Sequence, residues 1–276
     1  MNISGLTKIA GIFGFPVRHT LSPAMHNAAL QALKLDFAYL PFEVDPASLG
    51  AAVEGIRAMN LRGVNVTIPH KETVMKFLDA IDPLAKKIGS VNTIVNNNGK
   101  LTGYNTDGIG FLRDIENNGF NPKGKTAVLL GAGGAGRAVA AVLSWAKLKK
   151  LYITDMDEAK AKALARRITN AEFVKFSGWK YKANSVDLLI NATPAGMHKG
   201  PAPIKSGELK KNIFVYDLVY NRRTELLAEA KKAGAKCCSG LGMLINQGAA
   251  AFELWTGKKA PILIMRKALL KQLRKK

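Results

Sequence analysis

Cysteine and histidine, the residues that build disulfide frameworks and most zinc sites, are scarce in this chain of 276 residues. The two cysteines, Cys237 and Cys238, are adjacent, and a disulfide between neighbouring residues is strained. The four histidines are His19, His26, His70 and His198. No two of them have a metal-type spacing such as His-x-x-x-His. The sequence therefore argues against a disulfide scaffold, and we expect no bound metal.

Long apolar runs and acidic residues are also scarce. No apolar run approaches the roughly 20 residues that span a bilayer, and the first residues lack the pattern of a signal peptide. We therefore expect a cytoplasmic protein with no membrane partner. Lysine and arginine number 41 against 20 acidic residues, which gives a formal net charge of +21. These cations are not interleaved with aromatics as in RNA-binding motifs, so we expect no nucleic-acid partner but easier encounters with anionic small molecules.

Strand-type and helix-type segments alternate through the first third of the chain, which predicts an α/β layer with a mostly parallel sheet. The expected strands are residues 9–14, 37–44 and 63–68. The expected helices begin at Ser22-Pro23, cover residues 47–59 and begin again at Pro69, since serine followed by proline is typical of an N-cap and first helical residue. Residues 91–96 and 101–104 flank an Asn-Asn-Gly-Lys turn and predict a β-hairpin.

The most informative segment is Val128 to Val139, in which an apolar strand leads into Gly-x-Gly-x-x-Gly and then an apolar helix. In this pattern Gly131 permits a tight turn, Gly133 lets a pyrophosphate approach the backbone, and Gly136 lets helix and strand pack closely. The free N–H groups of the helix start bind phosphates. The pattern predicts a dinucleotide site, and the alternative is a glycine-rich turn with a purely structural role.

A second α/β unit therefore begins near Lys125. Its later strands are expected at residues 151–154, 188–191 and 213–217, with helices from Asp157 and Thr224. The last two expected helices, 244–255 and 262–273, have no strand between them and suggest a return of the chain to the first domain. Two such domains leave a cleft, which is the usual place for a ligand.

Two charged residues are candidates for proton transfer. Lys71 follows an expected strand, and a cation in a first helical turn opposes the helix dipole unless an anion or a task retains it. Asp107 stands at the entrance to another helix, where it is either an N-cap or the partner of Lys71 across the cleft. For Lys71 the alternative is a solvated lysine compensated by Glu72. Tyr-x-x-x-Lys, the short-chain dehydrogenase solution to proton donation, does not occur.

Together these motifs resemble one family, shikimate dehydrogenase, almost from end to end. The segments that carry the resemblance are residues 14–23, 65–71, 90–93, 103–108, 131–137, 191–197, 217–220 and 242–250. It implies a substrate domain at 1–106 and 241–276 and a Rossmann dinucleotide domain at 107–240, with the active site between them. The implied reaction is reversible reduction of 3-dehydroshikimate to shikimate in aromatic biosynthesis, in a monomer or homodimer that uses NAD or NADP.

The resemblance also implies residue roles, with Lys71 and Asp107 as the catalytic pair. Hydroxyl, amide and phenol side chains would contact the carboxylate, hydroxyls or carbonyl of the substrate: Thr20, Ser22, Asn65, Thr67, Asn92, Tyr220 and Gln247. Singly, an Asn92 cap, an exposed Gln247 and a loop aromatic at Tyr220 are equally good interpretations. The cofactor residues would be Gly131, Ala132, Gly133, Gly134, Ala135, Gly136, Asp155 and Thr193.

Two departures from the family pattern bear on specificity. Thr20 replaces a common serine, and its methyl group narrows the carboxylate pocket, which leaves the discrimination between shikimate and quinate open. The alternative function is a quinate or dual quinate/shikimate dehydrogenase, which a preference for NAD would favour. Asp155-Met156-Asp157 stands where NADP-using members place Asn-Arg-Thr. Met156 cannot bind a 2′-phosphate, and Asp155 can accept hydrogen bonds from a ribose, so the sequence favours NAD over NADP. A more distant alternative is a protein that binds dinucleotide or nucleic acid without turnover.

Overall fold

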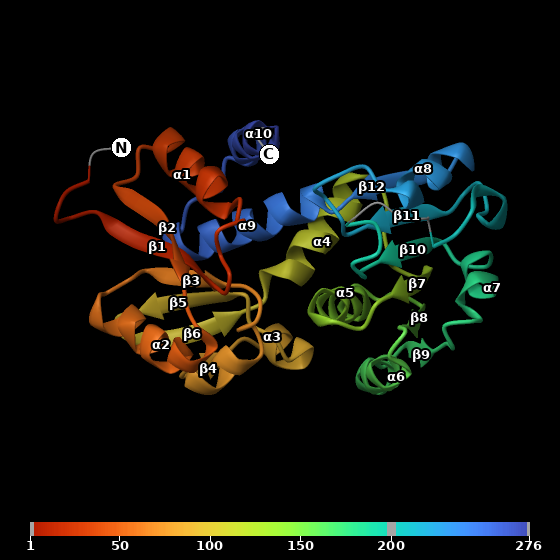
Figure 1. Cartoon of the computed structure of the whole chain (residues 1–276), viewed down its shortest axis with the longest axis horizontal. Helices are drawn as coiled ribbons and strands as arrows, with labels where there is room; N and C mark the ends of the chain where they lie inside the picture. Colours follow the sequence, from red (N-terminus) through yellow and green to blue (C-terminus); the bar gives the residue numbers. More distant parts are fainter. Residues whose placement is uncertain (1–2, 198–202, 275–276) are drawn as a thin grey trace. The chain divides into compact units, whose positions relative to one another are not determined.

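The computed structural model describes residues 3–197 and 203–274, which leaves His198 outside the described residues. The chain forms two compact units: residues up to Gly110 combine with those from Ile245 onward, and Phe111–Leu244 form the second unit (Figure 1). The sequence predicts divisions at 106/107 and 240/241. In the structure the chain passes between the units inside α4 (Thr106–Asn117) and α9 (Leu241–Thr256).

The sheet of the first unit has the strand order β2-β1-β3-β5-β6-β4. Its strands are β1 (Lys8–Gly14), β2 (Phe37–Glu43), β3 (Gly63–Val66), β4 (Ala80–Ile81), β5 (Thr93–Asn97) and β6 (Lys100–Tyr104). Strand β1 lies parallel to both β2 and β3, with Ala10 beside Tyr39 and Gly63. Strand β5 runs antiparallel to β3 and β6. The predicted α/β layer and the predicted hairpin are both confirmed.

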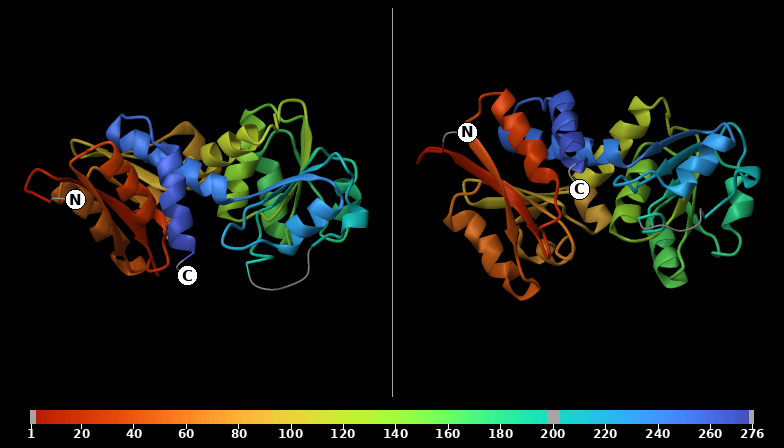
Figure 2. Two further views of the ribbon diagram at one scale, coloured as in Figure 1. Left: turned by 90° about the horizontal axis from the view of Figure 1, so that it is seen from above. Right: turned by 45° about the horizontal axis from the view of Figure 1, so that its top comes forward.

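Helices pack around this sheet. They are α1 (Ser22–Ala32), α2 (Leu49–Ala58), α3 (Pro83–Ile88) and α10 (Ile262–Leu273), together with α9. Helix α10 packs against α1, so the end of the chain does return to the first unit (Figure 2). Ser22 is the first helical residue rather than the predicted N-cap, which is Leu21. The Ser22 hydroxyl therefore does not cap the helix.

The predicted helix from Pro69 is wrong. Residues 69–72 form turns, and only a short 3-10 helix, Thr73–Phe77, follows. An α-helix would need the Lys71 carbonyl to accept from the amide four residues on, but that carbonyl accepts from the Val91 N–H at 2.8 Å. His70 is also held, because its Nε2 lies 2.7 Å from the Val44 carbonyl oxygen. Tertiary hydrogen bonds thus fix Lys71 in a turn.

The second unit is a parallel sheet in the order β12-β11-β10-β7-β8-β9. Its strands are β7 (Thr126–Leu130), β8 (Lys150–Thr154), β9 (Ala171–Phe173), β10 (Leu188–Asn191), β11 (Phe214–Asp217) and β12 (Lys236–Ser239). Its helices are α5 (Gly134–Trp145), α6 (Glu158–Arg167), α7 (Trp179–Ala183) and α8 (Glu225–Lys232). This is the doubly wound order of dinucleotide-binding sheets. The strands β8 and β9 follow on one side of β7, and β10, β11 and β12 follow on the other, so the strand order reverses between β7 and β10.

Buried, mostly aliphatic side chains form a hydrophobic core in each unit. The strands β7 and β10 are apolar on both faces, as expected of parallel strands covered by helices on two sides. The predicted starts of α6 and α8 are confirmed, since the Asp157 side chain accepts from the Lys160 N–H and the Thr224 side chain from the Leu227 N–H. No helix within residues 3–197 and 203–274 is long and apolar enough to cross a bilayer.

Candidate active site

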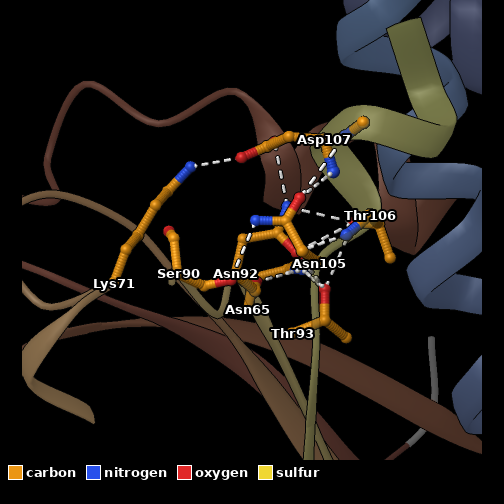
Figure 3. A network of polar contacts seen from close by, with 9 residues as sticks. Asn65, Lys71, Ser90, Asn92, Thr93, Asn105, Thr106 and Asp107 are labelled. Atoms are coloured by element: carbon orange, nitrogen blue, oxygen red, sulfur yellow. Dashed lines mark hydrogen bonds and ion pairs between the residues drawn. The ribbon is translucent and has the colours of Figure 1, made fainter. Parts of the chain in front are cut away.

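The side chains of Lys71 and Asp107 form a salt bridge within the first unit. Lys71 Nζ lies 2.7 Å from Asp107 Oδ2, and the two side chains are 26% and 13% exposed (Figure 3). Lys71 comes from the turn after β3, and Asp107 from the first turn of α4. The pair predicted to face each other across a cleft therefore lies within one unit. A half-buried, hydrogen-bonded ammonium and carboxylate can pass a proton to or from a bound oxygen.

Asp107 is not the cap of its helix. The Asn105 Oδ1 accepts from the N–H groups of Asp107 at 3.1 Å and Gly108 at 3.4 Å, which is the N-cap role. Asn105 is itself fixed because its Nδ2 donates to the Ser90 carbonyl at 3.0 Å. The capping alternative for Asp107 is wrong, and its carboxylate is left to contact other side chains.

Asn92 orients that carboxylate. Its Nδ2 donates to Asp107 Oδ1 at 2.9 Å and to Thr106 Oγ1 at 3.0 Å. Its Oδ1 accepts from the Thr106 N–H at 2.7 Å and from the Thr93 hydroxyl at 3.0 Å. Both donors and both acceptor positions of the carboxamide are therefore used by the protein. Asn92 acts here as a support of Asp107, and its contact with a substrate stays a prediction.

Asn65 is the next member of the same network. Buried at 5% exposure on β3, it donates from Nδ2 to the Asn92 carbonyl at 3.2 Å and to Thr93 Oγ1 at 3.0 Å. Its Oδ1 accepts from the Tyr39 hydroxyl at 2.7 Å. Hydrogen bonds thus run from Asn65 through Thr93 and Asn92 to Asp107 (Figure 3).

The remaining predicted substrate residues of the first unit are Thr20, Ser22, Thr67 and Gln247. Thr20 Oγ1 accepts from the Ser22 N–H at 3.3 Å, and Ser22 opens α1 with 8% exposure. Thr67 follows β3, and its N–H donates to the Phe13 carbonyl at 2.9 Å. Gln247 is 9% exposed in α9, so it is not the exposed helix residue of the alternative interpretation.

Tyr220 belongs to the second unit and is 38% exposed. It lines a hollow of about 330 Å³. The other lining residues are Arg222, Arg223, Leu227, Lys231, Cys237, Cys238 and Ser239. Burial raises the pKa of both cysteine thiols, and both cysteines are free.

The glycine loop of the second unit has the geometry that a dinucleotide needs. Gly131 has φ +101°, a conformation that side chains rarely adopt, and a Cβ there would lie 2.9 Å from the Ala192 backbone. Gly133 is the N-cap of α5, and a Cβ at Gly133 or Gly134 would have no heavy atom within 4 Å. The loop therefore leaves an open approach to the first N–H groups of α5, where phosphates are bound.

Thr193 lies beside this loop because β10 neighbours β7. Its N–H and hydroxyl donate to Asn191 Oδ1 at 3.1 and 2.6 Å, and Asn191 Nδ2 donates to Asp217 Oδ1 at 3.0 Å. The Thr224 hydroxyl donates to the other oxygen of Asp217 at 2.5 Å. Burial raises the pKa of Asp217. These hydrogen bonds fix the segment after β10 in which Thr193 lies.

Asp155 at the end of β8 is bound to the same loop. Its Oδ2 accepts from the Ala132 N–H at 2.7 Å, and its Oδ1 accepts from the Asp157 N–H at 2.9 Å. The neighbouring Met156 is 84% exposed, and Asp157 is paired with Lys160 at 3.1 Å. The carboxylate thus ties the glycine loop to the turn after β8.

Several residues of these networks were missing from the predicted site. Tyr39, Thr93, Asn105 and Thr106 support the first unit's network, and Asn191 and Asp217 support Thr193. All of them except Tyr39 stand inside motifs that the sequence singles out, so those motifs are their signal. In the part of the chain that the structure describes, no three histidine, cysteine or acidic side chains are grouped as metal ligands.

Comparison with known proteins agrees with this architecture. A shikimate dehydrogenase (NADP(+)) from Desulforamulus reducens is 49% identical over 285 residues, which covers 99% of this chain and 98% of the relative. The chain belongs to the shikimate dehydrogenase family. Residues 12–94 match the family's substrate binding domain, residues 114–201 the shikimate/quinate 5-dehydrogenase domain, and residues 240–270 the shikimate 5′-dehydrogenase C-terminal domain.

Solved members of the family have the same fold. A shikimate dehydrogenase solved with NADP+ is 41% identical with a TM-score of 0.92, over 99% of this chain and 98% of that one. The Listeria monocytogenes enzyme, solved with shikimate and NAD, is 36% identical with a TM-score of 0.93, over 97% of this chain and 98% of that one. The predicted α/β fold with a Rossmann domain is confirmed.

Proposed function

We propose that this chain is a shikimate dehydrogenase, which reversibly reduces 3-dehydroshikimate to shikimate with a nicotinamide dinucleotide. The observation that carries the proposal is the Lys71–Asp107 pair, held at 2.7 Å in a chain that matches shikimate dehydrogenases over 99% of its length. Reduction of a ketone needs a hydride at carbon and a proton at oxygen. The dinucleotide supplies or accepts the hydride.

Lys71 transfers this proton, and Asp107 holds Lys71 in position. In reduction the Lys71 ammonium donates its proton to the oxygen of the former carbonyl, and in oxidation the amine takes the proton of the hydroxyl. Asp107 fixes the Lys71 side chain through Oδ2, and Asn92 fixes Asp107 through Oδ1. The oxygen of the substrate therefore meets a donor whose position is set before binding, which is the condition for efficient general acid–base catalysis.

The substrate residues suit a small polyhydroxy acid. Thr20 and Ser22 would bind the carboxylate, with Tyr220 nearby, and Asn65, Thr67, Asn92 and Gln247 would meet hydroxyls or the carbonyl. A site of this kind discriminates strongly, because a missing substrate hydroxyl leaves buried polar groups without partners. The glycine loop at Gly131 to Gly136, with Thr193, would hold the dinucleotide.

Absorbance at 340 nm during shikimate oxidation tests this function, with NAD and with NADP. We expect turnover by the native chain and loss of turnover, with dinucleotide binding retained, in Lys71→Ala. The matched control is Lys76→Ala, which removes the same charge from an exposed position over the Phe77 ring. No turnover with either cofactor, combined with salt-sensitive binding of DNA, would favour the non-catalytic alternative.

We further propose that the enzyme prefers NAD to NADP. Asp155 presents a carboxylate at the end of β8, Met156 carries no charge, and the nearby Lys160 is already paired with Asp157. A 2′-phosphate would meet like charge there, whereas a ribose hydroxyl would find an acceptor. The relative from D. reducens is named for NADP(+). A cofactor inferred from that relative would therefore be NADP, whereas residues 155–157 predict NAD.

Kinetics with both cofactors decide the preference. We expect a higher kcat/KM with NADH than with NADPH, and a shift toward NADPH in the double variant Asp155→Asn, Met156→Arg. A higher efficiency of the native enzyme with NADPH would contradict the proposal. Quinate oxidation run in parallel tests the dual quinate/shikimate alternative raised by Thr20. A cytoplasmic location and a monomeric or homodimeric state stay predictions from the sequence.

A further inference from the structure

Tyr39 on β2 is buried at 1% exposure and has no part in the mechanism above. Its hydroxyl donates to Asn65 Oδ1 at 2.7 Å. Tyr39 therefore contacts a residue, Asn65, to which the proposed function assigns a hydroxyl or the carbonyl of the substrate.

The bonds of Asn65 limit what it can offer a ligand. A carboxamide has two N–H donors and two acceptor positions on its oxygen. Both donors are used, by the Asn92 carbonyl and by Thr93 Oγ1, and Tyr39 uses one acceptor position. Within the described residues, Asn65 keeps one acceptor position. Without breaking one of these bonds, it can therefore contact a substrate only by accepting a hydrogen bond, as from a hydroxyl group.

The Tyr39 ring is held rigidly. His26 stacks on it with ring centroids 4.3 Å apart and planes 11° apart, and the Trp255 ring lies 5.8 Å away. Asn27 holds the backbone, because its Nδ2 donates to the Tyr39 carbonyl and its Oδ1 accepts from the Tyr39 N–H, both at 2.9 Å. Ring and backbone are thus fixed on both sides, and the hydroxyl has a defined position.

The protonation of this cluster is also fixed. Burial raises the pKa of the Tyr39 phenol well above its usual value of 10.0, so the hydroxyl keeps its proton. Burial lowers the pKa of His26 to about 3, so the stacked imidazole is neutral. The hydroxyl of Tyr39 is therefore a permanent donor with one proton, which it gives to Asn65.

We propose that Tyr39 is a positioning residue for substrate recognition, whose hydroxyl orients the Asn65 carboxamide to accept a hydrogen bond from a substrate hydroxyl. Because the bond from Tyr39 occupies one acceptor position of Asn65 Oδ1, it fixes the direction in which the second position can accept. This inference rests on the proposed function.

The variant Tyr39→Phe removes only the hydroxyl oxygen. We expect it to raise the KM for shikimate roughly fivefold to tenfold, as for loss of one buried hydrogen bond. The value of kcat and the KM for the dinucleotide should stay within about twofold, since the Lys71–Asp107 pair is left intact. A merely structural defect would instead lower the folded fraction, and with it kcat, without a selective rise in one KM.

Tyr216→Phe is the matched control. Tyr216 is also fully buried, and its hydroxyl donates at 2.7 Å to Oδ2 of Asp114, which is not one of the proposed substrate residues. We expect this variant to lose stability without a change in the KM for shikimate. A thermal melt of each variant shows that the compared proteins are folded at the assay temperature.

A double-variant cycle tests the route through Asn65. If Tyr39 acts through Asn65, Tyr39→Phe should change the KM for shikimate by less than about twofold in an Asn65→Ala background. The same fold-change in both backgrounds, or an unchanged KM in folded Tyr39→Phe, would overturn the inference and leave the proposed function standing. Absence of shikimate turnover in the native enzyme would instead remove the proposed function, and the inference with it.

A second measurement needs no variant, and so covers a Tyr39→Phe protein that does not fold. Shikimate analogues in which one ring hydroxyl is replaced by fluorine, which cannot donate a hydrogen bond, are compared with shikimate as competing ligands of the native enzyme. An Asn65 oxygen that accepts from a substrate hydroxyl predicts that the replacement at one ring position weakens binding at least about fivefold. Equal binding of shikimate and every fluoro analogue would contradict the proposal.

Discussion

The last glycine of the Gly-x-Gly-x-x-Gly segment, Gly136 in α5, offers a sharp test of how the second unit is built. A Cβ at Gly136 would lie 2.0 Å from the Gly131 carbonyl oxygen, a backbone atom that no side-chain rotation can move away. A Cβ at Gly134, two residues earlier in α5, would have no heavy atom within 4 Å. Gly136→Ala and Gly134→Ala therefore make the same chemical change in one helix with different steric results.

The expected magnitudes follow from two opposing effects. Replacing a helical glycine by alanine stabilises the helix by roughly 0.5–1 kcal/mol where the methyl group fits. At position 136 the helix and the loop must separate by about 1 Å before the contact reaches 3.0 Å, the shortest that Cβ atoms normally show. Such overpacking costs about 1–3 kcal/mol. We expect Gly136→Ala to lower the free energy of unfolding by about 1–2 kcal/mol, and Gly134→Ala to leave it unchanged or slightly raised.

Thermal unfolding and a fluorescence titration with NADH and NADPH measure both consequences. A loss of this size lowers Tm by about 2–8 °C. Because the Gly131 carbonyl belongs to the loop that would hold the phosphates, we also expect Gly136→Ala to weaken dinucleotide binding by about tenfold or more. A Gly136→Ala protein that melts with the native chain and binds dinucleotide equally well would refute the reasoning, since the steric contact would then be relieved without cost.

Two further predictions concern the first unit. Asn92→Ala removes the donor that holds Asp107 Oδ1, so we expect kcat to fall by about 10–100-fold with the KM for dinucleotide unchanged; an unaltered kcat in steady-state assays would contradict the positioning role. His26 has its folded-state pKa lowered from 6.5 to about 3, so its contribution to stability is present above pH 6.5 and is lost as the pH falls toward 3. Urea unfolding should show the native chain losing stability relative to His26→Phe by up to about 1.4 kcal/mol per pH unit in that range, and parallel pH profiles would refute this.

Much of the fold could be predicted because its signals are local. Apolar runs gave β7 and β10, the glycine pattern gave the loop before α5, and the Asn-Gly turn gave the β5–β6 hairpin. The edge strands β9 and β12 could not be found this way, because each has only three or four residues and no apolar run of its own. Their pairing with β8 and β11 creates them.

The position of Lys71 shows how tertiary structure overrides a local signal. A proline after a strand is typical of a helix start, and the helix expected there supplied the dipole argument for Lys71. Instead, the Val91 N–H donates to the Lys71 carbonyl, and His70 Nε2 is hydrogen-bonded to the Val44 carbonyl. Lys71 is paired with Asp107 as the sequence predicts. That prediction rested on the charges of the two residues and on the family resemblance, and not on the helix dipole.

The asparagines of the site illustrate what a motif leaves undetermined. Asn65, Asn92 and Asn105 are one residue type near strand ends, and sequence alone gives no reason to assign them different tasks. Their hydrogen bonds distinguish the three tasks. Asn105 caps the start of α4, and all donor and acceptor positions of the Asn92 carboxamide are used by Thr93, Thr106 and Asp107. Among the described residues, Asn65 keeps one acceptor position. If the proposed substrate contacts hold, a hydroxyl would bond to Asn65 without breaking a hydrogen bond of the described residues. It would bond to the Asn92 carboxamide only by displacing Thr93, Thr106 or Asp107, so binding there would be coupled to the orientation of the Asp107 carboxylate.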